Sequence, residues 1–253
     1  MNLDQKVIAI TGAARGLGLS MAKVFAAKGA QLALIDVNQD RLKEVEESFS
    51  KAGIRAKAYA VDITDEDTVI TLFEMIVQDF GTLNGLVNNA GITRDGMLIK
   101  VVDGAVVRRM SLKNWNAVIN VNLTGTFLCG REAAAQMVEH NAEGVIINIS
   151  SIAKAGNYGQ SNYSAAKAGV AALSVTWAKE LSRHNIRVAA IAPGFIATEM
   201  TASMRDDVIE ETRRSIPLKR FGSPEEIAET AVTIFENDYI TGRVLEIDGG
   251  MRL

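Results

Sequence analysis

Seven short apolar runs recur along the chain, and segments with a helical pattern of apolar positions separate them. The runs are rich in Val, Ile and Ala without regular alternation, which is typical of strands buried on both faces of a parallel sheet. They occupy residues 6–12, 31–37, 56–63, 85–91, 144–151, 187–194 and 243–250. Because strand and helix alternate throughout, we predict one α/β domain over residues 1–253, with a doubly wound parallel sheet of about seven strands and helices on both faces.

Capping residues mark the ends of the helices between these runs. Thr64 precedes a turn of acidic residues and is expected to cap one helix. A fuller signature, with an N-cap, a first-turn proline and a capping box, occurs at Ser223, Pro224 and Glu226. Three glycines fall where helices should stop, and these are Gly29, Gly53 and Gly81.

Composition excludes several classes of function. A net charge of -3 argues against binding to nucleic acid or to an anionic membrane, and no apolar run reaches membrane-spanning length. Strand-like sequence begins almost at once, so we expect no signal peptide, and the single cysteine, Cys129, fits the reducing cytoplasm. His140 and His184 lack metal-ligand spacing, so no metal site is expected, and the G-x-S-x-G motif of serine hydrolases does not occur.

A glycine-rich turn, "TGAARGLG" at 11–18, follows the first run and opens the first helix. That context makes the motif informative. Gly12 permits a tight turn, whereas Gly16 and Gly18 remove side chains so that a pyrophosphate can approach the helix N-terminus. The turn therefore predicts a site for a dinucleotide.

Two residues near this turn point to different cofactors. Asp36 ends the second run, where an acid can accept hydrogen bonds from the adenosine ribose; capping of a helix near Asn38 is the alternative interpretation. Arg15 favours NADP, because its charge can pair with a 2′-phosphate, but Asp36 would repel that phosphate. We therefore expect NAD, with NADP as the alternative.

Six motifs in a fixed order carry a resemblance to a known family. They are the glycine turn, "NNAG" at 88–91, Asn122 in "NVNLTG", a serine ending the fifth run, Y-x-x-x-K at 163–167 and "PG" at 193–194. Together they resemble the short-chain dehydrogenase/reductase family over essentially the whole chain. The resemblance implies a Rossmann-type fold and NAD(P)-dependent oxidoreductase activity on CH–OH groups. The segments "APGFIATEM" and "ITGRVLEIDGGM" are most similar to the 3-oxoacyl-[acyl-carrier-protein] reductase branch.

That branch implies reduction of a 3-oxoacyl thioester in fatty acid biosynthesis, by a cytoplasmic homotetramer. An NAD-dependent dehydrogenase of another small alcohol, sugar or steroid is the alternative. A non-catalytic, cofactor-binding regulatory protein is a third hypothesis, but such a protein would be expected to lose Tyr163 or Lys167, and both are present.

Tyr163 and Lys167 lie four residues apart, which places them on one face of a helix. Hydride transfer to a ketone requires a proton, and a nearby ammonium favours ionisation of a phenol and lowers its pKa. The resemblance makes Tyr163 the general acid in reduction and the general base in oxidation, and lets Lys167 bind the nicotinamide ribose. Tyr158 lacks a lysine four positions later and is interpreted as a substrate-loop or packing residue.

Two further catalytic positions each have two candidates. Matching the fifth run without gaps assigns the carbonyl-polarising hydroxyl to Ser151, whereas spacing back from Tyr163 points to Ser150; we favour Ser151. By resemblance, Asn122 holds a water that relays protons to Lys167, and Asn120 is the weaker alternative.

The resemblance also assigns cofactor contacts around the turn and after later strands. Residues 89–91 should approach the adenosine ribose, and 62–63 the adenine, while the segment 193–198 should line the nicotinamide amide and the phosphates. The full expected set is Gly12, Arg15, Gly16, Leu17, Gly18, Asp36, Asp62, Ile63, Asn89, Ala90, Gly91, Tyr163, Lys167, Pro193, Gly194, Ile196 and Thr198.

Two segments depart from the resemblance. The reductases of this branch present basic residues to an acidic carrier protein before the fifth strand, but "VEHNAEG" (138–144) has two glutamates and no Lys or Arg; Arg183 and Arg187 are the candidates to compensate. The connection 96–115 is longer than usual and mixes apolar and basic residues. It is expected either to cover a substrate tail or to make subunit contacts.

Overall fold

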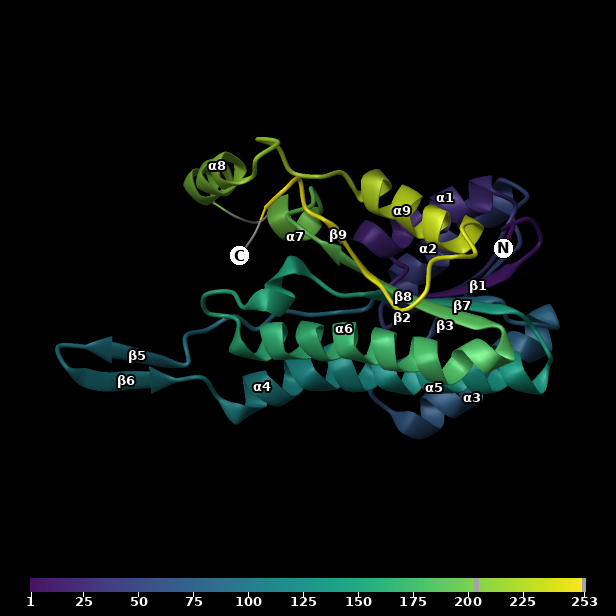
Figure 1. Cartoon of the computed structure of the whole chain (residues 1–253), viewed down its shortest axis with the longest axis horizontal. Helices are drawn as coiled ribbons and strands as arrows, with labels where there is room; N and C mark the ends of the chain where they lie inside the picture. The colour runs from purple at the N-terminus through teal and green to yellow at the C-terminus, as the bar shows by residue number, and fades with distance from the viewer. Residues whose placement is uncertain (203–204, 252–253) are drawn as a thin grey trace.

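A seven-stranded parallel sheet forms the centre of the protein (Figure 1). The structure is a computed structural model that describes residues 1–202 and 205–251. The strand order is β3-β2-β1-β4-β7-β8-β9, and every neighbouring pair is parallel, which confirms the predicted doubly wound sheet. The strands are β1 (Val7–Thr11), β2 (Gln31–Asp36), β3 (Ala56–Ala60), β4 (Gly85–Asn88), β7 (Gly144–Ile149), β8 (Ile186–Pro193) and β9 (Val244–Ile247).

Helices cover both faces of this sheet (Figure 1). One face packs against α1 (Gly16–Ala27), α2 (Gln39–Lys51) and α9 (Pro224–Glu236), and the other against α3 (Glu66–Phe80), α5 (Thr126–Glu139) and α6 (Ser161–Leu181). Successive side chains of a strand point to opposite faces, so Ile8 and Ile10 of β1 join the first core while Val7 and Ala9 join the second. The residues of both cores are buried, which explains why the apolar runs lack alternation.

Most of the remaining helical elements lie at the carboxyl ends of the strands. They are α4 (Leu112–Ile119), a π-helix (Asn120–Gly125), a 3₁₀ turn (Ile152–Ala155), α7 (Glu199–Ala202) and α8 (Asp206–Ser215). A second 3₁₀ turn (Ser182–His184) lies instead between α6 and the start of β8. The chain changes direction between β1 and β4, the switch point at which doubly wound sheets bind ligands. No helix in the described part of the chain is long and apolar enough to cross a membrane.

Most predicted helix boundaries are confirmed, and one is wrong. Ser223 and Glu226 form the capping box at the start of α9, and Gly81 ends α3 in the left-handed conformation. The cap of α3 is Asp65 rather than Thr64, because the Asp65 carboxylate accepts the amide of Thr68. Thr64 instead donates its backbone amide and hydroxyl to Asp62.

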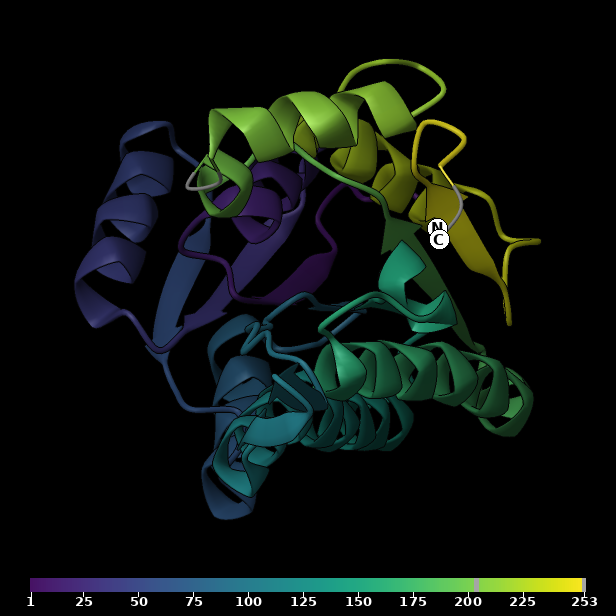
Figure 2. The same cartoon turned by 90° about the vertical axis from the view of Figure 1, so that its left-hand side faces the viewer.

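Residues 96–115 do not form an irregular connection. They contain an antiparallel hairpin of β5 (Ile99–Val102) and β6 (Ala105–Arg109), which projects from the body of the molecule (Figure 1) and points toward the viewer in Figure 2. Asp103 and Gly104 both have positive φ (49° and 78°), the geometry of the tight turns that match strand twist. The Asp-Gly pair between apolar residues was the local signal for this hairpin.

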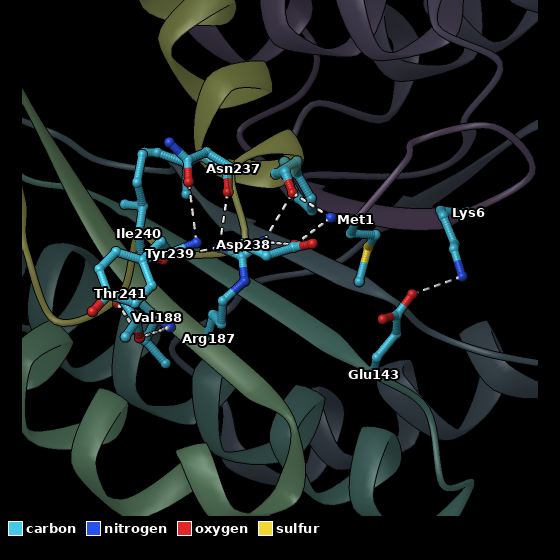
Figure 3. A network of polar contacts seen from close by, with 12 residues as sticks. Met1, Lys6, Glu143, Arg187, Val188, Asn237, Asp238, Tyr239, Ile240 and Thr241 are labelled. Carbon is cyan, nitrogen blue, oxygen red and sulfur yellow. Dashed lines mark hydrogen bonds and ion pairs between the residues drawn. The ribbon is translucent and has the colours of Figure 1, made fainter.

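A network of polar contacts joins the start of β8 to the end of α9 and the chain after it (Figure 3). The Arg187 guanidinium donates to the carbonyls of Ile234, Phe235 and Ile240 at 2.8–2.9 Å and to the Asp238 carboxylate. The amino group of Met1 also donates to Phe235 and Asp238. The Arg187 side chain is therefore occupied by hydrogen bonds within the fold, which argues against its compensating at a docking surface.

Replacing Arg187 by Met should lower the free energy of unfolding by about 2–3 kcal/mol, because the carbonyls it satisfies lose their donors. Urea denaturation of purified protein measures the change. Arg183→Met is the matched control, since Arg183 is exposed and its side chain bonds only His184 among the described residues; it should change stability by less than about 0.5 kcal/mol. Equal stability of the two variants would contradict the role assigned to Arg187.

Candidate active site

Lys167 is a buried cation on the second turn of α6. Its side chain lies within the protein, the residue being only 4% exposed, and its Nζ donates to the carbonyl of Ile149 at 2.7 Å. Within the described residues no carboxylate forms an ion pair with it. Burial without a counter-charge lowers the pKa of Lys167 to about 8.

Tyr163 lies one helical turn before Lys167, and its ring centroid is 5.6 Å from the lysine Nζ. Contrary to the expectation from sequence, the pKa of the Tyr163 phenol is raised. Burial is the main cause and the charge of Asp95 adds to it, while a hydrogen bond with Ser151 acts in the opposite direction. The phenol is therefore protonated at neutral pH.

The two serine candidates point in different directions. The Ser150 hydroxyl is buried and donates to the backbone carbonyl of Lys167 at 2.8 Å. The Ser151 hydroxyl is partly exposed, interacts with the Tyr163 phenol and accepts the amide of Ala153. Only Ser151 therefore shares a surface with Tyr163, whereas Ser150 fixes α6 against the end of β7.

Asn122 lies in the π-helix, an irregularity frequently found at functional sites. Its side chain is fully buried, accepts the amide of Ile92 at 2.9 Å and donates to the Ile92 carbonyl at 3.0 Å. Asn120, the weaker candidate, is exposed at the start of the π-helix. The amide of Asn122 thus holds the segment after Gly91 against the π-helix.

Small residues of α6 allow the π-helix to approach Tyr163 and Lys167. A Cβ added at Gly169 would lie 2.9 Å from the Leu123 side chain, closer than real contacts allow. Gly169, two residues after Lys167 in "SNYSAAKAG", therefore lets the Leu123 side chain pack closely on α6, and a larger residue there would have to displace that side chain.

The glycine turn is tight and open at the same time. A Cβ at Gly18 would lie 2.1 Å from the carbonyl oxygen of Gly12, so this position tolerates only glycine. Gly16 has φ of +55°, and a Cβ there would enter open space. Arg15 at the N-cap provides no side-chain cap, which leaves the first amides of α1 directed at this space. These features fit a phosphate group at the N-terminus of α1.

Thr11 joins the glycine turn to the "NNAG" segment. Its hydroxyl accepts the amides of Asn89 and Ala90, both at 3.0 Å, and the Asn89 side chain donates to the carbonyls of Thr11 and Gly12. The two segments therefore form one surface beside the switch point. Thr11 was missed from sequence, although its position at the end of a strand, directly before Gly12, indicated a residue beside the glycine turn.

The carboxylate of Asp36 also faces the glycine turn and accepts the amides of Ala14 (3.1 Å) and Asn38 (3.0 Å). Asn38 itself caps α2 by accepting the amide of Arg41. Asp36 is therefore positioned at the turn, and the cap near Asn38 is a separate feature.

Two arginines near Asp36 share one carboxylate. Glu199 of α7 pairs with Arg41 at 3.1 Å and with Arg15 at 3.5 Å, and these arginines lower the pKa of its carboxyl. Arg41 and Glu199 were missed from sequence, because their pairing joins α2 to a segment far along the chain.

The other expected cofactor residues lie around the same end of the sheet. Ile63 is buried beneath Gly125 of the π-helix, and Asp62 is exposed above it. After β8, Gly194 approaches the backbone of Asp248 so closely that a Cβ would lie 2.7 Å away. The remaining members are Leu17, packed partly against the core, Gly91 beside Asn122, Pro193 at the end of β8, Ile196 in the core and Thr198, whose amide bonds Thr201.

Comparison with known proteins finds similar sequences over nearly the whole chain. A family model described as "Enoyl-(Acyl carrier protein) reductase" matches residues 12–252. The chain is 41% identical to a 3-oxoacyl-[acyl-carrier-protein] reductase of Thermotoga maritima, with 99% of both chains covered. Reductases of the same name from Aquifex aeolicus (39% identity, 99% of both chains) and Chlamydia trachomatis (40%, 98% of both) are also similar.

Tyr163 should ionise only above the ordinary phenol pKa of about 10 in the free protein. Ultraviolet difference titration of the protein against its Tyr163→Phe variant isolates this phenol. Ser151→Ala removes the one hydrogen bond that lowers this pKa and should shift the midpoint further upward, whereas Ser150→Ala should leave it unchanged. A midpoint well below 10 would contradict the environment described for Tyr163.

Proposed function

The chain belongs to the short-chain dehydrogenase/reductase family, and on that premise we propose that it reduces a 3-oxoacyl thioester to the 3-hydroxyacyl form. The observation that carries the proposal is the arrangement of Tyr163, Lys167 and Ser151 at the end of β7, beside a turn suited to a dinucleotide. The names of the relatives support the class of substrate.

Protonation of the ketone oxygen falls to Tyr163. The reduced nicotinamide supplies a hydride to the carbonyl carbon when it is bound. Tyr163, protonated at neutral pH, gives its proton to the developing alkoxide, and Ser151 donates a hydrogen bond to the same oxygen. The phenolate that remains is stabilised by the Lys167 ammonium one turn away.

Lys167 and Asn122 prepare the site for the next cycle. The proposed relay returns a proton to Tyr163 through Lys167 and a water held by Asn122. The side-chain amide nitrogen of Asn122 carries two hydrogens, and it donates one of them to the carbonyl of Ile92. The other hydrogen is the proposed donor to that water.

NAD is the proposed cofactor, with NADP as the alternative. The Asp36 carboxylate at the glycine turn would accept hydrogen bonds from a free ribose hydroxyl and repel a 2′-phosphate. Arg15 in the glycine turn and Arg41 of α2 already share Glu199. The 2′-phosphate of NADP would therefore have to displace the Glu199 carboxylate before it could pair with Arg15 or Arg41.

A cytoplasmic homotetramer completes the proposal. A groove between α5 and α6 is lined by Phe127, Ala134, Val138, Trp177 and Leu181, and part of this apolar lining is exposed. Such a surface suits contact with a second copy of the chain.

The first test replaces the proposed acid. Tyr163→Phe should lower turnover of acetoacetyl thioesters at least about a thousandfold, with NADH affinity changed less than about threefold. Ser151→Ala should lower kcat by roughly a hundredfold. Ser150→Ala is the matched control and should act mainly on stability. Full activity of Tyr163→Phe would refute the proposal.

Steady-state assays of the unaltered protein on a panel of thioesters, sugars, steroids and small alcohols separate the substrate classes.

The second test concerns cofactor choice. NADH should bind more tightly than NADPH in fluorescence titrations. Asp36→Ala should improve NADPH affinity about tenfold, because a like charge is removed, and Glu199→Gln should also improve it by freeing Arg15 and Arg41. Glu210→Gln, which removes the carboxylate that pairs with Arg213, is the control and should change nothing. Tighter NADPH binding by the unaltered protein would contradict the choice of NAD.

A further inference from the structure

The β5–β6 hairpin has two chemically different faces. Cross-strand partners share a face, so the register Lys100↔Arg108 and Val102↔Ala105 defines a basic face. The pairs Ile99↔Arg109 and Val101↔Val106 define the opposite, largely apolar face. Every residue of both strands is exposed.

The basic face carries an unfavourable pair of charges. Lys100 and Arg108 lie directly opposite each other across an antiparallel ladder, where like charges repel. Neither forms an ion pair with any carboxylate in the described chain. Anionic groups of a partner would relieve this repulsion, so the face is complementary to an acidic surface.

The base of the hairpin is fixed to the helix that carries Tyr163. The amide of Gly96 donates to the carbonyl of Gly159, and Gln160 donates to Asp95. On the next residues, Asn162 donates to the carbonyls of Arg94 and Asn114, which lie on either side of the hairpin. A molecule bound to the hairpin is therefore held beside the N-terminus of α6, at the same end of the molecule as α7 and α8 (Figure 1).

The surface expected to receive a carrier protein is poor in cations over residues 138–144, and the exposed Arg183 is the remaining candidate there. Residues 138–144 contain Glu139 and Glu143, and Arg187 is used by the fold. We propose that the basic face of the hairpin, Lys100 with Arg108, docks an acidic carrier protein that delivers the 3-oxoacyl thioester to the Tyr163 site. This inference rests on the proposed function and adds the surface at which the partner binds.

The experiment compares one variant on two forms of the same substrate. Lys100→Glu/Arg108→Glu reverses the charge of this face. The two residues still repel each other as a like-charged pair, so the repulsion within the hairpin is comparable in both proteins. With an acetoacetyl group on an acidic acyl carrier protein, kcat/KM should fall about tenfold or more. With acetoacetyl-N-acetylcysteamine, a small thioester without a protein carrier, kcat/KM should change less than about twofold.

Two controls make the outcomes distinct. Lys179→Glu/Arg183→Glu reverses two exposed cations at the other end of α6, including the Arg183 candidate, and should leave both activities unchanged. Added salt should lower kcat/KM for the carrier-bound substrate in the unaltered protein but not in the hairpin variant.

Equal activity of the hairpin variant on the carrier-bound substrate would overturn the inference, as would a loss found only at Lys179 and Arg183. A change of oligomeric state in sedimentation, with both substrates affected alike, would instead assign the hairpin to a contact between copies of the chain and would also overturn it. Failure of the unaltered protein to reduce the small thioester would refute the proposed function itself.

Discussion

The burial of the Lys167 ammonium is the constraint on which the site depends. An ammonium removed from water without a counter-ion is costly, and here one backbone carbonyl, that of Ile149, is its hydrogen-bond acceptor. This contact requires α6 to lie close to the end of β7, where Ser150 in turn bonds the carbonyl of Lys167. Because the pKa is lowered, the cost to stability is fully present below pH 8 and is relieved as pH rises toward the unfolded pKa of about 10.4.

The position of Lys167 fixes the chemistry around it. One turn earlier, Tyr163 has a raised pKa and remains an acid, while Ser151 lies beside its hydroxyl. On the other side, Gly169 lets the π-helix approach, and Asn122 in that helix holds the segment that continues from "NNAG". The proposed proton-transfer residues and the glycine turn are thus positioned by a series of hydrogen bonds between side chains and backbone, in which Thr11 links the end of β1 to the segment after β4.

Much of the fold could be predicted from the sequence, because strands buried on both faces leave uninterrupted apolar runs and because Ser223 and Glu226 satisfy helix ends locally. The spacing of Tyr163 and Lys167 could also be predicted, because the two residues lie within one helical turn.

The pairing of Arg41 with Glu199 and the network of Arg187 were not predictable, since each joins residues distant in sequence. The direction of the Tyr163 pKa shift in the free protein was mispredicted, because burial of the phenol, which only the structure reveals, is the largest cause of the shift. The hairpin was not predicted, because its strands are exposed throughout and carry no buried apolar run, which leaves the Asp-Gly turn as the local signal.

The state of the Lys167 side chain can be measured directly by nitrogen-detected NMR of protein labelled at the lysine Nζ, with the resonance assigned by its loss in Lys167→Met. We expect the Lys167 resonance to titrate near pH 8, well below the ordinary lysine value of about 10.4. Titration of Lys167 at that ordinary value would contradict the buried, unpaired ammonium on which the proposed chemistry rests.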